Sequence, residues 1–191
     1  MAIGEYIILF AAILVGLAVA DLALSLHRLL RAGRTIRWTP LVPLLAFLVL
    51  CLVLNMWWAL FRNYTGLEEI SFVRFLPEVA VLLALFLLSA SALPDKELEP
   101  GSDLAEWHRG NRSQFWGMFA VYLLLVIVNV SLRGIEAGWS LATFFERNLA
   151  NFLLAVAALA AIRLRKMWFD YLLAVIWIVL IGLFWANLTL D

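Results

Sequence analysis

Six runs of mostly apolar residues, each about 20 residues long, leave this chain few ways to fold. They cover residues 4–26, 39–61, 70–93, 114–133, 139–162 and 167–189. A helix of that length matches the hydrocarbon thickness of a bilayer, and lipid offers no partner to an unpaired backbone N–H or C=O group. Because 65% of the 191 residues are hydrophobic, too few polar residues remain to cover a soluble domain of this size. The sequence therefore predicts an all-α integral membrane protein.

The six spans follow one another as three consecutive helical hairpins. The longest connection, residues 94–113, is too short to form a separate soluble domain. We therefore expect residues 1–191 to form a single six-transmembrane-helix bundle. The inner half of the fifth span, "AVAALAAI" (155–162), is rich in small residues, which let helices approach closely in lipid. This pattern predicts a central position for the fifth helix.

Lysine and arginine lie mostly on one side of the predicted bundle. Only Arg62 and Arg133 fall at the opposite ends of the spans. Cytoplasmic connections collect positive charge, so the basic side should face the cytoplasm and both termini should lie outside. Short connections also favour a location in a bacterial inner membrane. The ten residues on the basic side are Arg28, Arg31, Arg34, Arg37, Lys96, Arg109, Arg112, Arg163, Arg165 and Lys166.

The first basic connection also predicts a contact with lipid. Arginines next to a membrane span bind anionic lipid headgroups, although the orientation rule alone accounts for the same residues. The predicted headgroup contacts are Arg28, Arg31, Arg34 and Arg37.

The third span, "SFVRFLPEVAVLL" (71–83), carries two full charges and a helix breaker inside an apolar run. Arg74 and Glu78 are four residues apart and therefore share a helical face. Pro77 has no N–H to donate to the carbonyl of Val73, which predicts a bend at this point. Each intramembrane charge costs about 2.5–3.5 kcal/mol on insertion scales, so these charges need partners or water.

The fifth span repeats the pattern with Glu146, Arg147, Asn148 and Asn151. Glu78 and Arg147 each lie seven residues beyond a serine at the start of their span, which places both roughly 10 Å below it. The matching depth predicts a polar cluster between the third and fifth helices. Two interpretations remain open: a dry clamp that joins the two helices, or a water-filled vestibule that selects or relays an ion. The cluster comprises Arg74, Glu78, Glu146, Arg147, Asn148 and Asn151.

Acidic residues near the inner boundary have two interpretations. Asp21 and Asp170 could simply pair with the basic connections, or Asp21 and His27 could form a proton path, since imidazole titrates near neutral pH. Their six-residue separation places Asp21 and His27 on different helical faces, which weakens the second interpretation. A lipid-modifying enzyme would have to use these same three residues.

The 94–113 connection allows two further hypotheses. Asp103 and Glu106 have the spacing of a helix cap, which predicts a short helix anchored at the membrane surface by Leu104 and Trp107. Acidic residues of this connection also follow the spacing of a calcium-binding loop, but Pro100 occupies the position that requires glycine.

Other chemistry lacks its sequence patterns. The chain shows no nucleophile elbow, HExxH motif or P-loop, and no Cys/His spacing typical of a metal site. A net charge of zero argues against nucleic acid as a partner. We therefore expect a protein that is not an enzyme and has no cofactor. The sequence favours an ion or small-solute channel or transporter, and the alternative is an accessory or scaffold subunit in a homo-oligomer or larger membrane complex.

Overall fold

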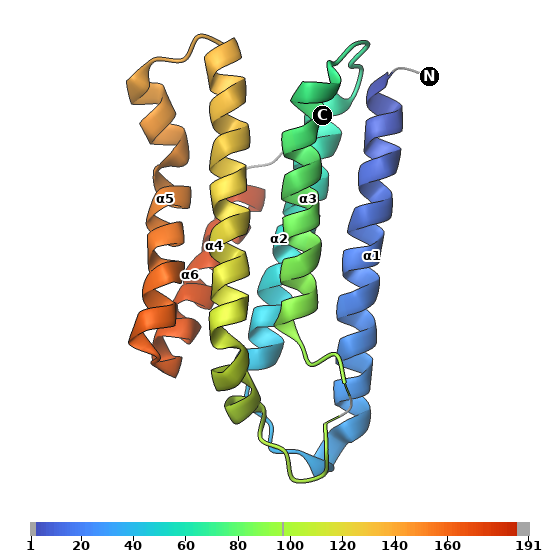
Figure 1. Cartoon of the computed structure of the whole chain (residues 1–191), viewed down its shortest axis with the longest axis vertical. Coiled ribbons are helices and arrows are strands. Elements are labelled where there is room, and N and C mark those ends of the chain that lie inside the picture. The colour runs from blue at the N-terminus through green and yellow to red at the C-terminus, as the bar shows by residue number, and fades with distance from the viewer. Residues whose placement is uncertain (1–2, 97, 187–191) are drawn as a thin grey trace.

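Each predicted span folds as one helix in the computed structural model, which describes residues 3–96 and 98–186 (Figure 1). All six helices are long and apolar enough to cross a membrane, and the described residues contain no strand. The predicted six-helix bundle is therefore confirmed. The end of the predicted sixth span, residues 187–189, lies outside the described residues. The helices are α1 (Ile3–Ala32), α2 (Leu41–Tyr64), α3 (Phe72–Ala92), α4 (Leu104–Glu136), α5 (Leu141–Leu164) and α6 (Met167–Ala186), with a short 3-10 turn η1 (Gly33–Thr35) after α1.

Helix α4 lies between α3 and α5 (Figure 1). It packs against both, whereas α3 and α5 make no contact with each other in the described chain. On the other side of the bundle, α1 packs against α2 and α3, and α6 packs against α2 and α5. This order decides which polar side chains can meet within the membrane.

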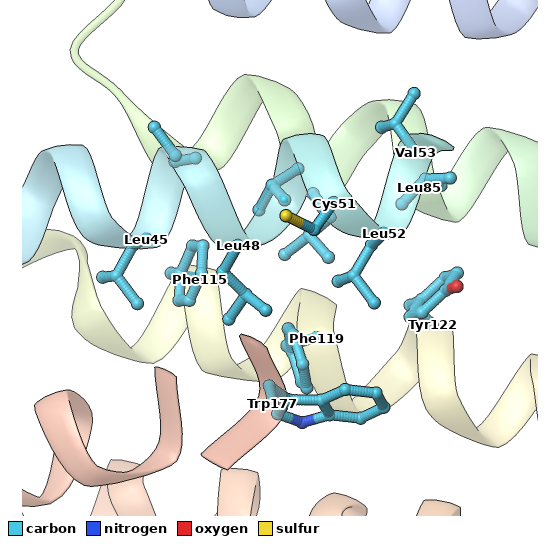
Figure 2. Close-up of a cluster of buried hydrophobic side chains, with 14 of the residues drawn as sticks. Leu45, Leu48, Cys51, Leu52, Val53, Leu85, Phe115, Phe119, Tyr122 and Trp177 are labelled. Carbon is cyan, nitrogen blue, oxygen red and sulfur yellow. The ribbon is translucent and has the colours of Figure 1, made fainter. Parts of the chain in front are cut away.

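The core is built around α2, which carries the largest set of fully buried side chains. Leu45, Leu48 and Leu52 of α2 face Phe115 and Phe119 of α4 in the core (Figure 2). The Phe119 ring packs against Trp177 of α6, with 5.5 Å between the ring centroids. The predicted central position of α5 is wrong. Its buried positions are mainly alanines, which allow α5 to pack closely on α4 from the periphery of the bundle.

The two long connections at the predicted cytoplasmic end are joined by backbone hydrogen bonds. The Arg37 N–H donates to the carbonyl of Ser102 (2.8 Å), and the Leu104 N–H donates to the carbonyl of Arg37 (3.1 Å). Asp103 caps α4, because its Oδ1 accepts from the Ala105 N–H at 2.7 Å. The predicted separate surface helix is wrong, however: residues 104–113 form the first turns of α4, and Leu104 is fully buried.

Glycine at position 4 allows α1 to dock on the connection between α2 and α3. The Gly4 N–H donates to the carbonyl of Leu67 at 3.0 Å, and a Cβ at Gly4 would lie 1.9 Å from the Tyr64 carbonyl oxygen. Gly4→Ala should therefore force α1 away from this connection and destabilise the fold by about 1–3 kcal/mol, as overpacking does. The melting temperature in detergent measures the effect.

Gly16→Ala is the matched control in the same helix, because no heavy atom lies within 4 Å of its added Cβ. It should leave the melting temperature unchanged or raise it, given the higher helix propensity of alanine. Equal melting temperatures for the two variants would contradict the docking described for Gly4.

Candidate functional site: a polar vestibule between α2, α3 and α4

The predicted cluster between the third and fifth helices is wrong because α4 separates them. Arg74 and Glu78 lie in the first turns of α3, and Glu146 and Arg147 lie on α5 beyond α4. The charges of α3 do find partners at the predicted depth. Those partners are Arg133 and Glu136, in the last turn of α4.

Two ion pairs connect α3 to α4. Arg74 Nη2 lies 2.7 Å from Glu136 Oε2, and both side chains are about half exposed. Arg133 Nη2 pairs with Glu78 Oε1 deeper in the bundle, where Glu78 is 3% exposed and Arg133 is 32% exposed. An exposed pair contributes at most about 1 kcal/mol, whereas a hydrogen bond between charged groups contributes about 1.5–3 kcal/mol when one partner is buried. The inner pair is therefore the energetically important one.

Local structure at the start of α3 positions these charges. The Ser71 side chain caps the helix by accepting from the Arg74 N–H at 3.3 Å. Pro77 lies inside the helix, so the carbonyl of Val73 loses its usual donor, and both residues line the same pocket. The Arg133 guanidinium also lies over the Tyr64 ring, 5.9 Å from its centroid, which adds a cation–π contact from α2.

A pocket of about 380 Å³ opens beside the outer pair, among the ends of α2, α3 and α4. A smaller pocket of about 140 Å³ lies deeper and shares Asn63, Asn129 and Arg133 with the first. Glu78 and the buried Tyr122 line this deeper pocket. We call the two pockets together the vestibule. It has two arginines and two glutamates along its walls, so its net charge is zero.

The remaining residues of the predicted cluster have other positions. The Arg147 guanidinium lies 4.4 Å from the ring centroid of Trp139, and that ring packs on Gly134 at the α4–α5 turn. Glu146 is exposed and forms no ion pair with a described residue. Asn148 is buried and donates to the carbonyl of Phe144 at 3.1 Å, while Asn151 is half-buried. None of these four lines the vestibule in the described chain.

The other residues predicted from sequence lie at the opposite end of the bundle. Asp21 is half-buried and His27 is exposed on α1, and the described chain shows no ion pair between them. Arg28 is held by a hydrogen bond to the carbonyl of Asp95 at 2.6 Å. Arg31, Arg34 and Arg37 are exposed, as contacts with headgroups would require.

Asp170 pairs with Arg112 of the 94–113 connection, as one interpretation of the sequence expected. The sequence did not predict that both belong to a fully buried polar network at the start of α4 and α6. Asp170 is its centre: Oδ1 accepts from Arg112 Nη2 (2.7 Å) and Trp116 Nε1 (2.8 Å), and Oδ2 lies 3.0 Å from His108 Nε2. Arg112 also donates to the carbonyl of Lys166 at 2.8 Å. The exposed fraction is 0% for Asp170, 2% for His108 and 4% for Arg112. The network joins α4 to α6 through Asp170 and to the α5–α6 turn through Lys166.

No protein-family model, curated protein or solved structure matches this chain. Among the described residues, no group of three or more histidines, cysteines or acidic residues is placed to hold a metal ion. The chemistry of the vestibule is therefore that of paired charges, asparagine amides and the buried Tyr122 hydroxyl. Such groups can bind a small polar solute or an ion.

Proposed function

We propose that this chain is a transporter or channel subunit that admits a small polar solute or ion to the vestibule from outside the cell. The observation that carries the proposal is the buried Arg133–Glu78 pair at the wall of a pocket that opens at the outer ends of α2, α3 and α4. Intramembrane charges of this kind mark substrate pathways in membrane proteins, and broken helices accompany them. Pro77 removes one backbone hydrogen bond of α3 at this level, although the helix continues through it.

Charge and volume indicate the class of solute. The vestibule is electrically neutral overall, which gives no preference for one sign of ion and suits a small polar or zwitterionic molecule. Its outer pocket, about 380 Å³, falls in the range of small-molecule sites. Beyond Tyr122, toward the start of α4, the bundle is filled by Phe115, Phe119 and Trp177 (Figure 2). This packing supports an outward-facing state that must rearrange to release a solute inside, as transporters do.

The proposed location is a bacterial inner membrane with both termini outside. The ten-to-two distribution of Lys and Arg between the two sides supports this orientation. The opening of the vestibule among the ends of α2, α3 and α4 that lie on the less basic side then faces the outside. Anionic lipid around the exposed Arg31, Arg34 and Arg37 is part of the same proposal.

Water in the vestibule is the first testable consequence. In a Cys51→Ala background, Asn129→Cys should react in intact cells with a membrane-impermeant methanethiosulfonate reagent, because a thiol must ionise in water to react. Val128→Cys is the matched control, since Val128 is exposed on the apolar surface of α4 and faces lipid. It should react much more slowly. Equal reactivity at the two positions would contradict a wet vestibule.

Transport itself is tested in proteoliposomes. Uptake of labelled zwitterionic amino acids and of Na⁺, K⁺ and H⁺ should exceed that of empty liposomes for at least one solute, and Arg133→Gln should reduce it. If Asn129→Cys is labelled but no solute is taken up, the accessory or scaffold function is favoured instead.

The orientation is tested separately in intact cells. Labelling of Thr65→Cys but not of Ala32→Cys from outside would support it.

A further inference from the structure

A separate pocket opens between α4 and α5 at the opposite end of the bundle from the vestibule. Its volume is about 350 Å³. Three of its six lining residues are arginines, and none is acidic. We call it the basic pocket; its lining residues are Arg109, Gly110, Arg112, Ser113, Ile162 and Arg165.

Arg112 forms the buried wall of the basic pocket and has an unused donor. Its Nη2 is committed to Asp170 and to the carbonyl of Lys166. Its Nε is buried and has no hydrogen-bond partner among the described residues. Buried donors in native proteins are nearly always paired, so the described partners of Arg112 leave part of its hydrogen-bonding capacity unused beside this pocket. The ion pair with Asp170 balances the charge of Arg112. The positive charges of Arg109 and Arg165 remain in the basic pocket.

Arg165 occupies an unfavourable backbone conformation. Its φ of 49° is left-handed, a region that disfavours residues with a Cβ. The other described residues with positive φ are all glycines: Gly33, Gly66, Gly101 and Gly138. At this turn between α5 and α6, the chain instead places an exposed arginine at the rim of the basic pocket. A binding role for its guanidinium accounts for that choice.

The depth of the basic pocket matches the headgroup region of a bilayer. Arg109, Arg112 and Ser113 immediately precede the apolar run of α4 that begins near residue 114. The exposed Trp168 lies at the start of α6, at the level where tryptophan prefers a membrane interface. Arginine binds phosphate oxygens with charged, directional hydrogen bonds. We propose that the basic pocket binds a phosphate group, carried either by an anionic lipid headgroup or by a soluble phosphate compound.

The test uses the full-length protein, delipidated in a non-ionic detergent, with the melting temperature as the readout. Phosphatidylglycerol, diacylglycerol as the phosphate-free lipid, and inorganic phosphate are titrated separately. Phosphatidylglycerol or inorganic phosphate should raise the melting temperature, and diacylglycerol should not. A shift with phosphatidylglycerol alone assigns the site to lipid, whereas a shift with inorganic phosphate alone assigns it to soluble phosphates. A shift with both still supports a phosphate site, and a shift with neither overturns the proposal.

Two double variants test whether phosphate binding requires the arginines of the basic pocket or only positive charge at this end of the bundle. Arg109→Gln with Arg165→Gln should weaken the apparent affinity about tenfold or more, the equivalent of one charged hydrogen bond. Arg163→Gln with Lys166→Gln removes the same charge from exposed positions at the same end of the bundle that do not line the pocket, and should leave the affinity unchanged. An equal loss in both double variants would overturn the proposal.

Arg165→Gly distinguishes binding from folding at the same position. Glycine relieves the left-handed strain, so the ligand-free protein should melt at a higher temperature than the wild type. Its affinity for the phosphate probe should nevertheless fall, because one guanidinium is lost. Unchanged affinity in this variant would argue that Arg165 has no part in binding and would remove the main support for the basic pocket.

Discussion

Asp170→Asn should lower the free energy of unfolding by about 3–5 kcal/mol, the cost of removing one partner of a buried ion pair. The asparagine keeps the size of the side chain but removes the negative charge that faces Arg112. Asp170 is fully buried and Arg112 is 4% exposed, so water can screen the arginine left behind only weakly. The amide also offers a single acceptor oxygen where the carboxylate accepts from Arg112 and Trp116 and contacts His108. A fall in melting temperature on the order of 10 °C should follow in detergent.

Asp95→Asn is the matched control for this prediction. It makes the same substitution at the same end of the bundle, but Asp95 is exposed and its described hydrogen bond uses the backbone carbonyl. Its effect should stay within about 0.5 kcal/mol, as is usual for surface substitutions. Adding Arg112→Gln to Asp170→Asn should recover part of the loss, since no unpaired charge then remains. A double variant no more stable than Asp170→Asn would contradict the ion-pair explanation.

The six spans were predictable from sequence because lipid imposes them. Every backbone group of a span must bond within the chain, and hydropathy and length alone then locate each helix. The sequence also indicated correctly that Arg74 and Glu78 need partners. Sequence spacing gives the depth of a side chain along its helix axis, but it does not say which neighbouring helix faces it. The predicted depth of the partners was therefore right, but they lie on α4 and not on the predicted fifth helix.

A signal for the true partners was present. Consecutive helices usually lie side by side, and α4 is the next helix after α3. Arg133 and Glu136 end α4 at the level where Arg74 and Glu78 begin α3, because the two helices are antiparallel. A comparison of depths between consecutive helices would have selected Arg133 and Glu136 as the partners of Arg74 and Glu78. It should have come before any comparison between the third and fifth spans.

The pairing of Asp170 with a basic connection was expected, but its burial and the roles of His108 and Trp116 were missed for a different physical reason. The apolar run of the fourth span begins near residue 114, so His108 and Arg112 were assigned to a connection. In the structure α4 already begins at Leu104. His108, Arg112 and Trp116 follow one another at intervals of four and thus share one face of a helix. That spacing was the available signal. Hydropathy cannot show that polar side chains are buried when they satisfy one another.

Glu78→Gln should destabilise the protein by about 1.5–3 kcal/mol, the contribution of a hydrogen bond to a charged group. Glu78 is buried, which would give the full cost of breaking a buried pair, but Arg133 is one-third exposed to the vestibule. Water can therefore screen the arginine that remains, and the loss should be smaller than that of Asp170→Asn. Glu136→Gln is the matched control at the half-exposed outer pair, and its cost should be at most about 1 kcal/mol.

The double variant Glu78→Gln with Arg133→Gln decides between a clamp and a solute site. In a dry clamp the pair serves only stability, so restoring charge balance should recover part of the lost melting temperature and leave any uptake unaffected. In a solute site, uptake in proteoliposomes should fall at least about tenfold in both the single and the double variant, since 1.4 kcal/mol of lost binding already has that effect. Recovered stability without recovered uptake therefore supports the proposed transport function. Full uptake by a stable double variant would assign the Arg133–Glu78 pair to helix packing alone.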